Sequence, residues 1–194
     1  VAKKLMATPK DVTVENLGDS INTEFADFSS NISLDGRALY FTSRRPWADG
    51  ASNGFRDPML NHYSEDIYQS SLAENDGWNS PSRMDMCKPQ FNEASVSVSI
   101  DERRVYTYND KKGQGDIYFS DLKNGSFSPI APVGKSGVNT ESRWETHYTV
   151  SPDGKMVFFV SDKESGYGKR DIYFMEETDG KWTEPKNIGG TINS

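Results

Sequence analysis

A four-part pattern of turn and aromatic residues recurs three times along this chain. Each copy has a Ser-x-Asp turn, an apolar run of six residues, the tripeptide Asp-Ile-Tyr, and then a Trp or Phe close to a Pro. The turns begin at Ser33, Ser99 and Ser151, the apolar runs read ALYFTS, RVYTYN and MVFFVS, and the tripeptides begin at Asp66, Asp116 and Asp171. Ser, Asp, Gly and Pro favour turns, whereas β-branched and aromatic residues favour strands, so each copy is predicted to be a small antiparallel sheet.

The spacing of the copies selects one architecture. Asp-Ile-Tyr recurs at intervals of 50 and 55 residues. The last copy shows four strand-like runs separated by turn residues, at 147–151, 156–161, 171–177 and 182–188. A period of about 50 residues made of four strands is typical of a β-propeller blade. The sequence therefore predicts an all-β fold, a partial β-propeller of three four-stranded antiparallel blades with one extra N-terminal strand.

Glu102 replaces the turn glycine in the second copy. The first and third copies have Gly36 and Gly154 at this position, where glycine makes a left-handed backbone conformation cheap. With a glutamate there, the second turn need not share that conformation.

The repeat resembles that of a known family, the TolB-type WD40-like (PD40) β-propeller repeats. The resemblance rests on S-x-D-G-x-x-L-Y-F-x-S, D-I-Y, W-x-x-P and L/I-G-x-x-I-N-S, and it covers residues 9–194. These motifs are most similar to those of outer-membrane-associated proteins of the Bacteroidetes, in which a propeller shares its chain with a peptidoglycan-binding OmpA-like domain. The resemblance implies a protein-binding scaffold of the cell envelope, in the periplasm and associated with the outer membrane, that reaches peptidoglycan only through a domain outside this chain.

The repeat also divides the chain into segments. They are a lead-in at 1–9, an outer strand at 10–20, and blades at 21–84, 88–138 and 141–194. Residues 17–23 match 188–194 and, with one extra residue, 133–140, so the N-terminal strand is predicted to be the outer strand of a blade whose inner strands lie elsewhere. Because known propellers have at least about four blades, we expect the chain to be part of a larger ring.

Charge and composition narrow the class of partner. With 22 basic and 29 acidic residues the net charge is −7, which disfavours nucleic acid and anionic membranes as partners. No apolar run is long enough to cross a bilayer, so direct membrane insertion is not expected. This negative charge is compatible with a basic or a small-molecule partner. The resemblance favours a protein partner in the envelope.

Metal ligands of the usual kinds are sparse. Cys87 is the single cysteine, which excludes an internal disulfide and a thiolate metal cluster, and we expect it to be a small half-buried side chain. The loop from Asn109 to Asp116 is rich in oxygen ligands, but it lacks the spacing of known calcium loops. No cofactor is therefore predicted, and calcium at this loop is the alternative.

One motif invites a catalytic interpretation. Gly18-Asp19-Ser20 is similar to the nucleophile block of GDS-type esterases, in which a His and an Asp activate the serine. Its counterparts in the repeat are Gly190-Thr191 and Ser136-Gly137, so the serine is interpreted as a turn residue. The chain has two histidines, His62 and His147, and its carboxylates are mostly repeated, so we expect a non-catalytic protein. The alternative is an accessory or gate propeller of a prolyl-oligopeptidase-type peptidase or a glycan-active enzyme.

Charge recurs at fixed places in each blade. An acid lies six residues before each turn serine, and a base lies ten residues after each turn aspartate. The acids are Asp27, Glu93 and Glu145, and the bases are Arg45, Lys111 and Lys163. Two interpretations remain open: the acids and bases pair within or between blades, or the acids form a ring at the channel entrance that faces a cationic partner.

The first blade carries a long insertion. Its turn and tripeptide aspartates lie 31 residues apart, against 15 and 18 in the other blades, and the surplus is residues 45–65. In a meander blade this connection and the one that enters the next blade emerge on the same face of the disc. Aromatic and arginine residues on such loops often dominate protein interfaces. The predicted binding residues are Trp47, Arg56, His62, Tyr63, Trp144 and Glu145. The alternative is a self-packed surface insertion.

Overall fold

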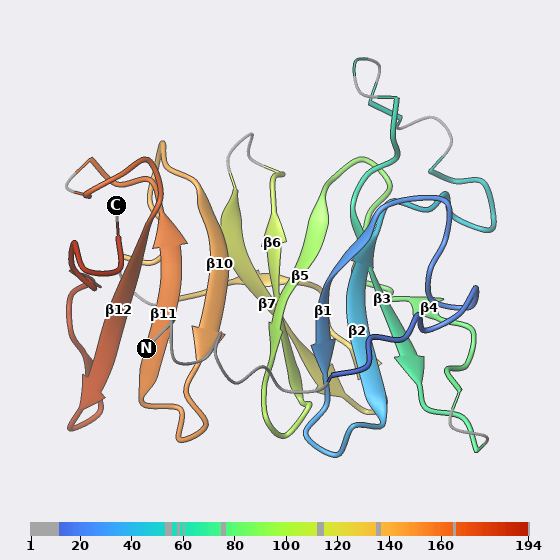
Figure 1. The fold of residues 1–194 in the computed structure, drawn as a ribbon. Coiled ribbons are helices and arrows are strands. Elements are labelled where there is room, and N and C mark those ends of the chain that lie inside the picture. Colours follow the sequence, from blue (N-terminus) through green and yellow to red (C-terminus); the bar gives the residue numbers. More distant parts are fainter. Residues whose placement is uncertain are drawn as a thin grey trace.

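The computed structural model describes residues 12–52, 56–57, 59, 61–74, 77–111, 115–134, 137–164 and 166–193. The predicted lead-in at residues 1–9 lies outside this part. Over the described residues every regular element is a β-strand, and the strands form three antiparallel sheets that stand side by side (Figure 1). No helix in this part of the chain is long and apolar enough to cross a bilayer.

Each sheet is a meander of strands that are neighbours in sequence. The first contains β1 (Asp27–Ile32), β2 (Ala38–Ser43), β3 (Asp66–Ser71) and β4 (Ser82–Arg83). The second contains β5 (Glu93–Val98), β6 (Arg104–Asn109), β7 (Asp116–Lys123), β8 (Ser126–Phe127) and β9 (Ala131–Pro132). The third contains β10 (Glu145–Val150), β11 (Met156–Ser161), β12 (Asp171–Thr178), β13 (Lys181–Trp182) and β14 (Lys186–Asn187). The apolar runs form β2, β6 and β11, and Asp-Ile-Tyr opens β3, β7 and β12, so the prediction of three antiparallel propeller blades is confirmed.

The outer strand of each blade is broken into two short pieces. In the second blade β8 and β9 both pair with β7, and in the third β13 and β14 both pair with β12. In the first blade a bridge between Leu72 and Trp78 takes the place of the first piece, and β4 is the second. A proline follows the aromatic residue in each blade, at Pro81, Pro129 and Pro185. A proline cannot donate a ladder hydrogen bond, so pairing is interrupted there.

The Ser-x-Asp turns are alike in all three blades. Ser33 Oγ accepts from Ala38 N (2.8 Å), which closes the turn between β1 and β2, and Ser99 makes the same contact in the second blade. Glu102 has φ 55°, close to the 73° of Gly36, so the second turn does share the left-handed conformation. The turn hydrogen bonds impose this shape although it is unfavourable for a residue with a Cβ atom.

The hydrophobic core lies mainly between neighbouring blades. Ile67 and Val105, both 0% exposed, belong to a cluster shared by the first and second blades. Ile117 and Val157, also 0% exposed, belong to a cluster shared by the second and third. Because each blade contributes apolar residues to the junction with its neighbour, burial of this surface holds the blades side by side.

The predicted N-terminal strand at residues 10–20 is not formed over its described part. Residues 12–17 pair with no strand of the described chain, and Val12 and Val14 are 69% and 92% exposed. A strand needs a partner for its N–H and C=O groups, and the described sheets offer none at this place. Residues 16–22 nevertheless take the local fold of residues 187–193. Asn16 Oδ1 accepts from Gly18 N and from Asn22 Nδ2, and Asn187 Oδ1 makes the two equivalent bonds.

Candidate functional site

A single side chain joins the outer segment of each blade to the backbone of its third strand. Asn139 Oδ1 accepts from Ile117 N (2.8 Å), and Asn139 Nδ2 donates to Ile117 O (2.7 Å). Asn193 binds Ile172 in the same way, at 2.9 and 3.0 Å. These carboxamides complete the backbone pairing of the Asp-Ile-Tyr strands at the place where one blade gives way to the next.

Cys87 occupies this position in the first blade. Ile67 N approaches Cys87 Sγ at 3.3 Å, and Sγ lies 3.9 Å from Ile67 O. A thiol is a weak donor and a weak acceptor, so these contacts hold the strand less firmly than a carboxamide does. The side chain expected to be half-buried is in fact 1% exposed.

The recurring acids are satisfied inside the blades. Asp27 forms an ion pair with Arg45 (2.9 Å), as the pairing interpretation predicts. Glu93 and Glu145 accept instead from uncharged side chains, and they are 1% and 0% exposed. Burial raises the pKa of both carboxyl groups. An acidic ring facing a cationic partner therefore cannot include these two residues.

The insertion of the first blade connects β2 to β3 and projects from one end of the sheets (Figure 1). Trp47 lies at its base and is only 9% exposed. Its Nε1 donates to Asp66 Oδ2 (2.7 Å), and the guanidinium of Arg83 lies 3.5 Å from the centre of its ring. Trp47 thus anchors the insertion and does not form part of an exposed binding surface. The prediction that Trp47 is an exposed binding residue is therefore wrong. A tryptophan whose N–H finds an acceptor can be buried, and burial of its large ring stabilises the fold.

Arg56, His62 and Tyr63 meet at one rim, as predicted. The guanidinium of Arg56 lies 5.1 Å from the ring centre of Tyr63, and that ring packs edge-on against Phe25 at 5.9 Å. Together with Asn92, which precedes β5 of the next blade, the three predicted residues line a pocket of about 270 Å³. We call this the rim pocket.

Arg44 contacts His62, one of the residues that line the rim pocket. Its guanidinium pairs with Glu65 and lies 3.0 Å from Nε2 of His62. Burial raises the pKa of the Glu65 carboxyl group, and the charge of Arg44 opposes that rise. His62 therefore faces a cation and helps to build the wall of the pocket.

Trp144 and Glu145 lie at the same end of the molecule, where β10 begins (Figure 1). The ring of Trp144 stacks on Tyr108, with ring centres 6.3 Å apart, and its backbone N–H donates to Asp162 (2.9 Å). Trp144 is half-buried, whereas Glu145 is fully buried and is not accessible to a partner. The structure thus gathers three of the six predicted residues in one pocket, and their binding role stays a prediction.

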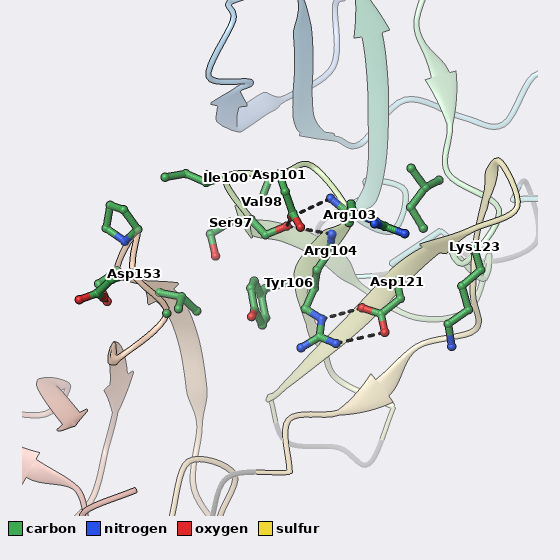
Figure 2. Close-up of a pocket in the computed structure, with 16 residues that line it drawn as sticks. Ser97, Val98, Ile100, Asp101, Arg103, Arg104, Tyr106, Asp121, Lys123 and Asp153 are labelled. Atoms are coloured by element: carbon green, nitrogen blue, oxygen red, sulfur yellow. Dashed lines mark hydrogen bonds and ion pairs between the residues drawn. The ribbon is translucent and has the colours of Figure 1, made fainter. Parts of the chain in front are cut away.

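A larger cleft opens at the opposite end, between the second and third blades. Its volume is about 760 Å³, and the turns that begin at Ser99 and Ser151 form part of its wall. Figure 2 shows Arg104 paired with Asp121 (2.6 Å between Nε and Oδ1), with Tyr106 beside them. No sequence motif signals this cleft, because it arises from the way two blades lie against each other.

The oxygen-rich loop of the second blade is largely used by the protein itself. Asn109 Oδ1 accepts from Lys111 N (2.8 Å), and Asp110 accepts from Asn92 (2.6 Å). Asp116 is 9% exposed at the start of β7, and residues 112–114 lie outside the described part. The described residues therefore add no support for calcium at this loop.

The fold is similar to that of solved β-propellers. A candidate TolB from Agrobacterium tumefaciens superposes with a TM-score of 0.52 and 18% identity over 84% of this chain. TolB from Acinetobacter baumannii gives a TM-score of 0.48 and 18% identity over 80%. A puromycin-hydrolysing peptidase of Mycobacterium tuberculosis gives 0.48 and 14% over 84%. No protein-family model and no curated protein matches the sequence.

The chain spans 50%, 31% and 22% of the length of these three proteins. At such identities the similarity shows the fold alone. The resemblance to TolB-type propellers thus holds at the level of structure, while an association with an OmpA-like domain has no support in these similarities.

Proposed function

We propose that this chain is a non-catalytic propeller that holds a protein partner at the rim pocket. The observation that carries the proposal is the insertion, a segment that the other blades do without. It is anchored by the buried Trp47 and forms a pocket with Asn92 of the next blade. Loops added to a rigid scaffold are where binding residues usually lie.

The chemistry of the rim suits a protein partner. Arg56 is exposed and lies over Tyr63, and arginine and tyrosine are enriched among the residues that dominate protein interfaces. The stacking limits the freedom of the guanidinium before a partner binds, which lowers the entropic cost of binding. Met59, 91% exposed on the same insertion, offers an adaptable apolar contact. A volume of about 270 Å³ accommodates a side chain or two rather than a whole small-molecule ligand.

Similarity to TolB-type propellers supports a place in the cell envelope, in the periplasm and associated with the outer membrane. Peptidoglycan would be reached only through a domain outside this chain. The net charge of −7 supports a protein partner over nucleic acid or an anionic membrane. The alternative is an accessory or gate propeller of a peptidase or a glycan-active enzyme, and a hydrolase domain in the full-length protein would favour it.

Site-specific photo-crosslinking tests the proposal. A benzophenone amino acid in place of Met59 should cross-link a protein in the envelope of cells that produce the full-length protein. The same amino acid in place of Leu34, 79% exposed in a turn at the opposite end, is the matched control and should give no such product. Cross-linking of the same protein to the same extent at both positions would contradict the proposal.

Arg56→Ala separates binding from stability. Because an interface arginine commonly contributes more than about 1 kcal/mol, the Met59 cross-link should fall by roughly five-fold or more. The thermal midpoint should stay unchanged because the side chain is exposed. An unchanged cross-link, or a lower thermal midpoint with the cross-link intact, would show that Arg56 serves the fold and not a partner.

A further inference from the structure

Three ligand-type side chains converge at the junction of the first and second blades. Asp66 opens β3, Cys87 lies in the outer segment after β4, and Glu93 opens β5. The Sγ atom of Cys87 and one carboxylate oxygen of each acid all lie within 4.8 Å of one another, and each residue is 1% exposed. We call this set the junction cluster.

Cys87 is a departure from the repeat that weakens local pairing. At the next junction Asn139 forms two hydrogen bonds with the backbone of Ile117, at 2.7 and 2.8 Å. Cys87 replaces those two bonds by contacts of 3.3 and 3.9 Å with Ile67. The exchange costs hydrogen-bond strength and places a sulfur atom beside two carboxyl groups. A thiol beside two carboxyl groups is suited to bind a metal cation.

Asp66 gives a second, independent sign of a ligand. Its Oδ2 accepts from Trp47 Nε1 (2.7 Å), but its Oδ1 is buried with no hydrogen-bond partner among the described residues. Buried polar atoms are nearly always paired, and an unpaired carboxylate oxygen is costly. This oxygen belongs to a side chain that is 1% exposed and that is part of the junction cluster.

The junction cluster is also short of positive charge. Two carboxyl groups and a thiol lie together in the interior, where a buried charge is stable only when it is paired or bound to a metal. Among the described residues, Arg83 is a cation whose charge acts on both Asp66 and Cys87, and its guanidinium lies over the ring of Trp47. A bound cation would supply positive charge beside these groups.

We propose that the junction cluster binds a divalent transition-metal cation, with zinc the best match, through Cys87 Sγ, Asp66 Oδ1 and a carboxylate oxygen of Glu93. A set of one sulfur and two oxygens suits zinc, whereas calcium and magnesium prefer oxygen alone. The ligands come from β3, from the outer segment of the first blade and from β5 of the second. The cation therefore ties two blades together and stabilises the fold, because the unfolded chain does not hold these groups in place.

Zinc retention on refolding is the first test. Because the ligands are buried, the full chain is refolded from urea with one equivalent of zinc, passed over a chelating resin and assayed for bound metal. We expect about one zinc per chain and a thermal midpoint above that of protein refolded with a chelator. Cobalt in place of zinc should give a thiolate-to-metal charge-transfer band in the near ultraviolet, which reports Cys87 directly. A refolded chain that retains no metal overturns the proposal.

Cys87→Asn is the matched variant, because the other two blades carry asparagine at this position. It should fold, since the new carboxamide can bridge the backbone of Ile67 as Asn139 bridges Ile117. It should lose the cobalt band and bind zinc at least ~100-fold more weakly, because even outer partners of a metal site contribute 10- to 100-fold to affinity. Equal zinc affinity in the wild type and in this variant would place the metal elsewhere and refute the site.

Discussion

Replacing Asn139 by alanine tests whether one carboxamide secures each blade. The substitution removes the acceptor for Ile117 N and the donor to Ile117 O, at 2.8 and 2.7 Å. Ile117 is 0% exposed, so its N–H is left without a partner in the interior, whereas its carbonyl oxygen still accepts from Val133 N (3.0 Å). An unsatisfied buried polar group costs about 1–3 kcal/mol. One such group predicts a loss of about 1–3 kcal/mol in the free energy of unfolding.

Urea unfolding followed by tryptophan fluorescence measures this loss. With a slope of about 2 kcal/mol per molar urea, the midpoint should fall by roughly 0.5–1.5 M. Asn22→Ala is the internal control. Asn22 donates to Asn16 Oδ1 (2.9 Å) as Asn193 donates to Asn187 Oδ1, but it lies in a segment that pairs with no strand of the described chain. That variant should change stability by no more than about 0.5 kcal/mol. If the two variants shift the midpoint equally, the carboxamide acts only within its turn and the reasoning is wrong.

Four further variants probe other features. Glu102→Gly should raise the free energy of unfolding by about 1 kcal/mol, since glycine adopts φ 55° without steric cost, whereas Gly154→Ala should lower it by a similar amount in the same urea assay. Trp47→Ala should cost about 3–5 kcal/mol and so cannot report on partner binding alone. Burial raises the pKa of Glu93 from 4.5 to about 8, so the metal-free native state binds more protons than the unfolded chain in that window, and stability should fall as pH rises through it. Glu93→Gln should flatten that decline; an unchanged pH profile would contradict the assignment.

Most of the fold could be predicted because turn residues mark the ends of the strands in each copy of the repeat. Each apolar run fills one strand, β2, β6 or β11, from its first residue to its last. The turn and the tripeptide mark where these strands begin and where their partners start. Three copies in register supply the antiparallel order without any long-range information. The break in the outer strand was not predicted, although the prolines that cause it are plain in the sequence.

The candidate site was predictable only in part, because its residues differ in what lies near them. Arg56, His62 and Tyr63 sit on an insertion, and a loop on a scaffold is exposed by default. Trp47 lies on the same insertion but finds the buried acceptor Asp66, a contact between residues 19 apart that no local pattern reveals. Glu145 was placed on the rim, although its repetition at Asp27 and Glu93 is what a structural role requires.

The equivalence of Cys87 with Asn139 and Asn193 could in principle be inferred from the sequence. Residues 133–140 and 188–194 align through a Gly-containing segment that ends in Asn139 and Asn193. The first blade has no glycine in its matching segment, Met84 to Cys87, so a comparison based on turn residues misses it. The shared backbone contact shows the correspondence: Met84 N donates to Ile67 O as Val133 N donates to Ile117 O in the next blade.

The departures from the repeat in the first blade meet at one residue. Asp66 accepts from the indole of Trp47, which anchors the insertion, and it also belongs to the junction cluster with Cys87. The charge on Asp66 sets the strength of the indole hydrogen bond, because an ionised acceptor binds a donor more tightly than a neutral one. A cation at the cluster favours the ionised form of Asp66 and so tightens the anchor of the insertion. The rim pocket and the junction cluster are therefore linked through two side chains, and a variant at the cluster must be checked at the rim before its effects are assigned to either.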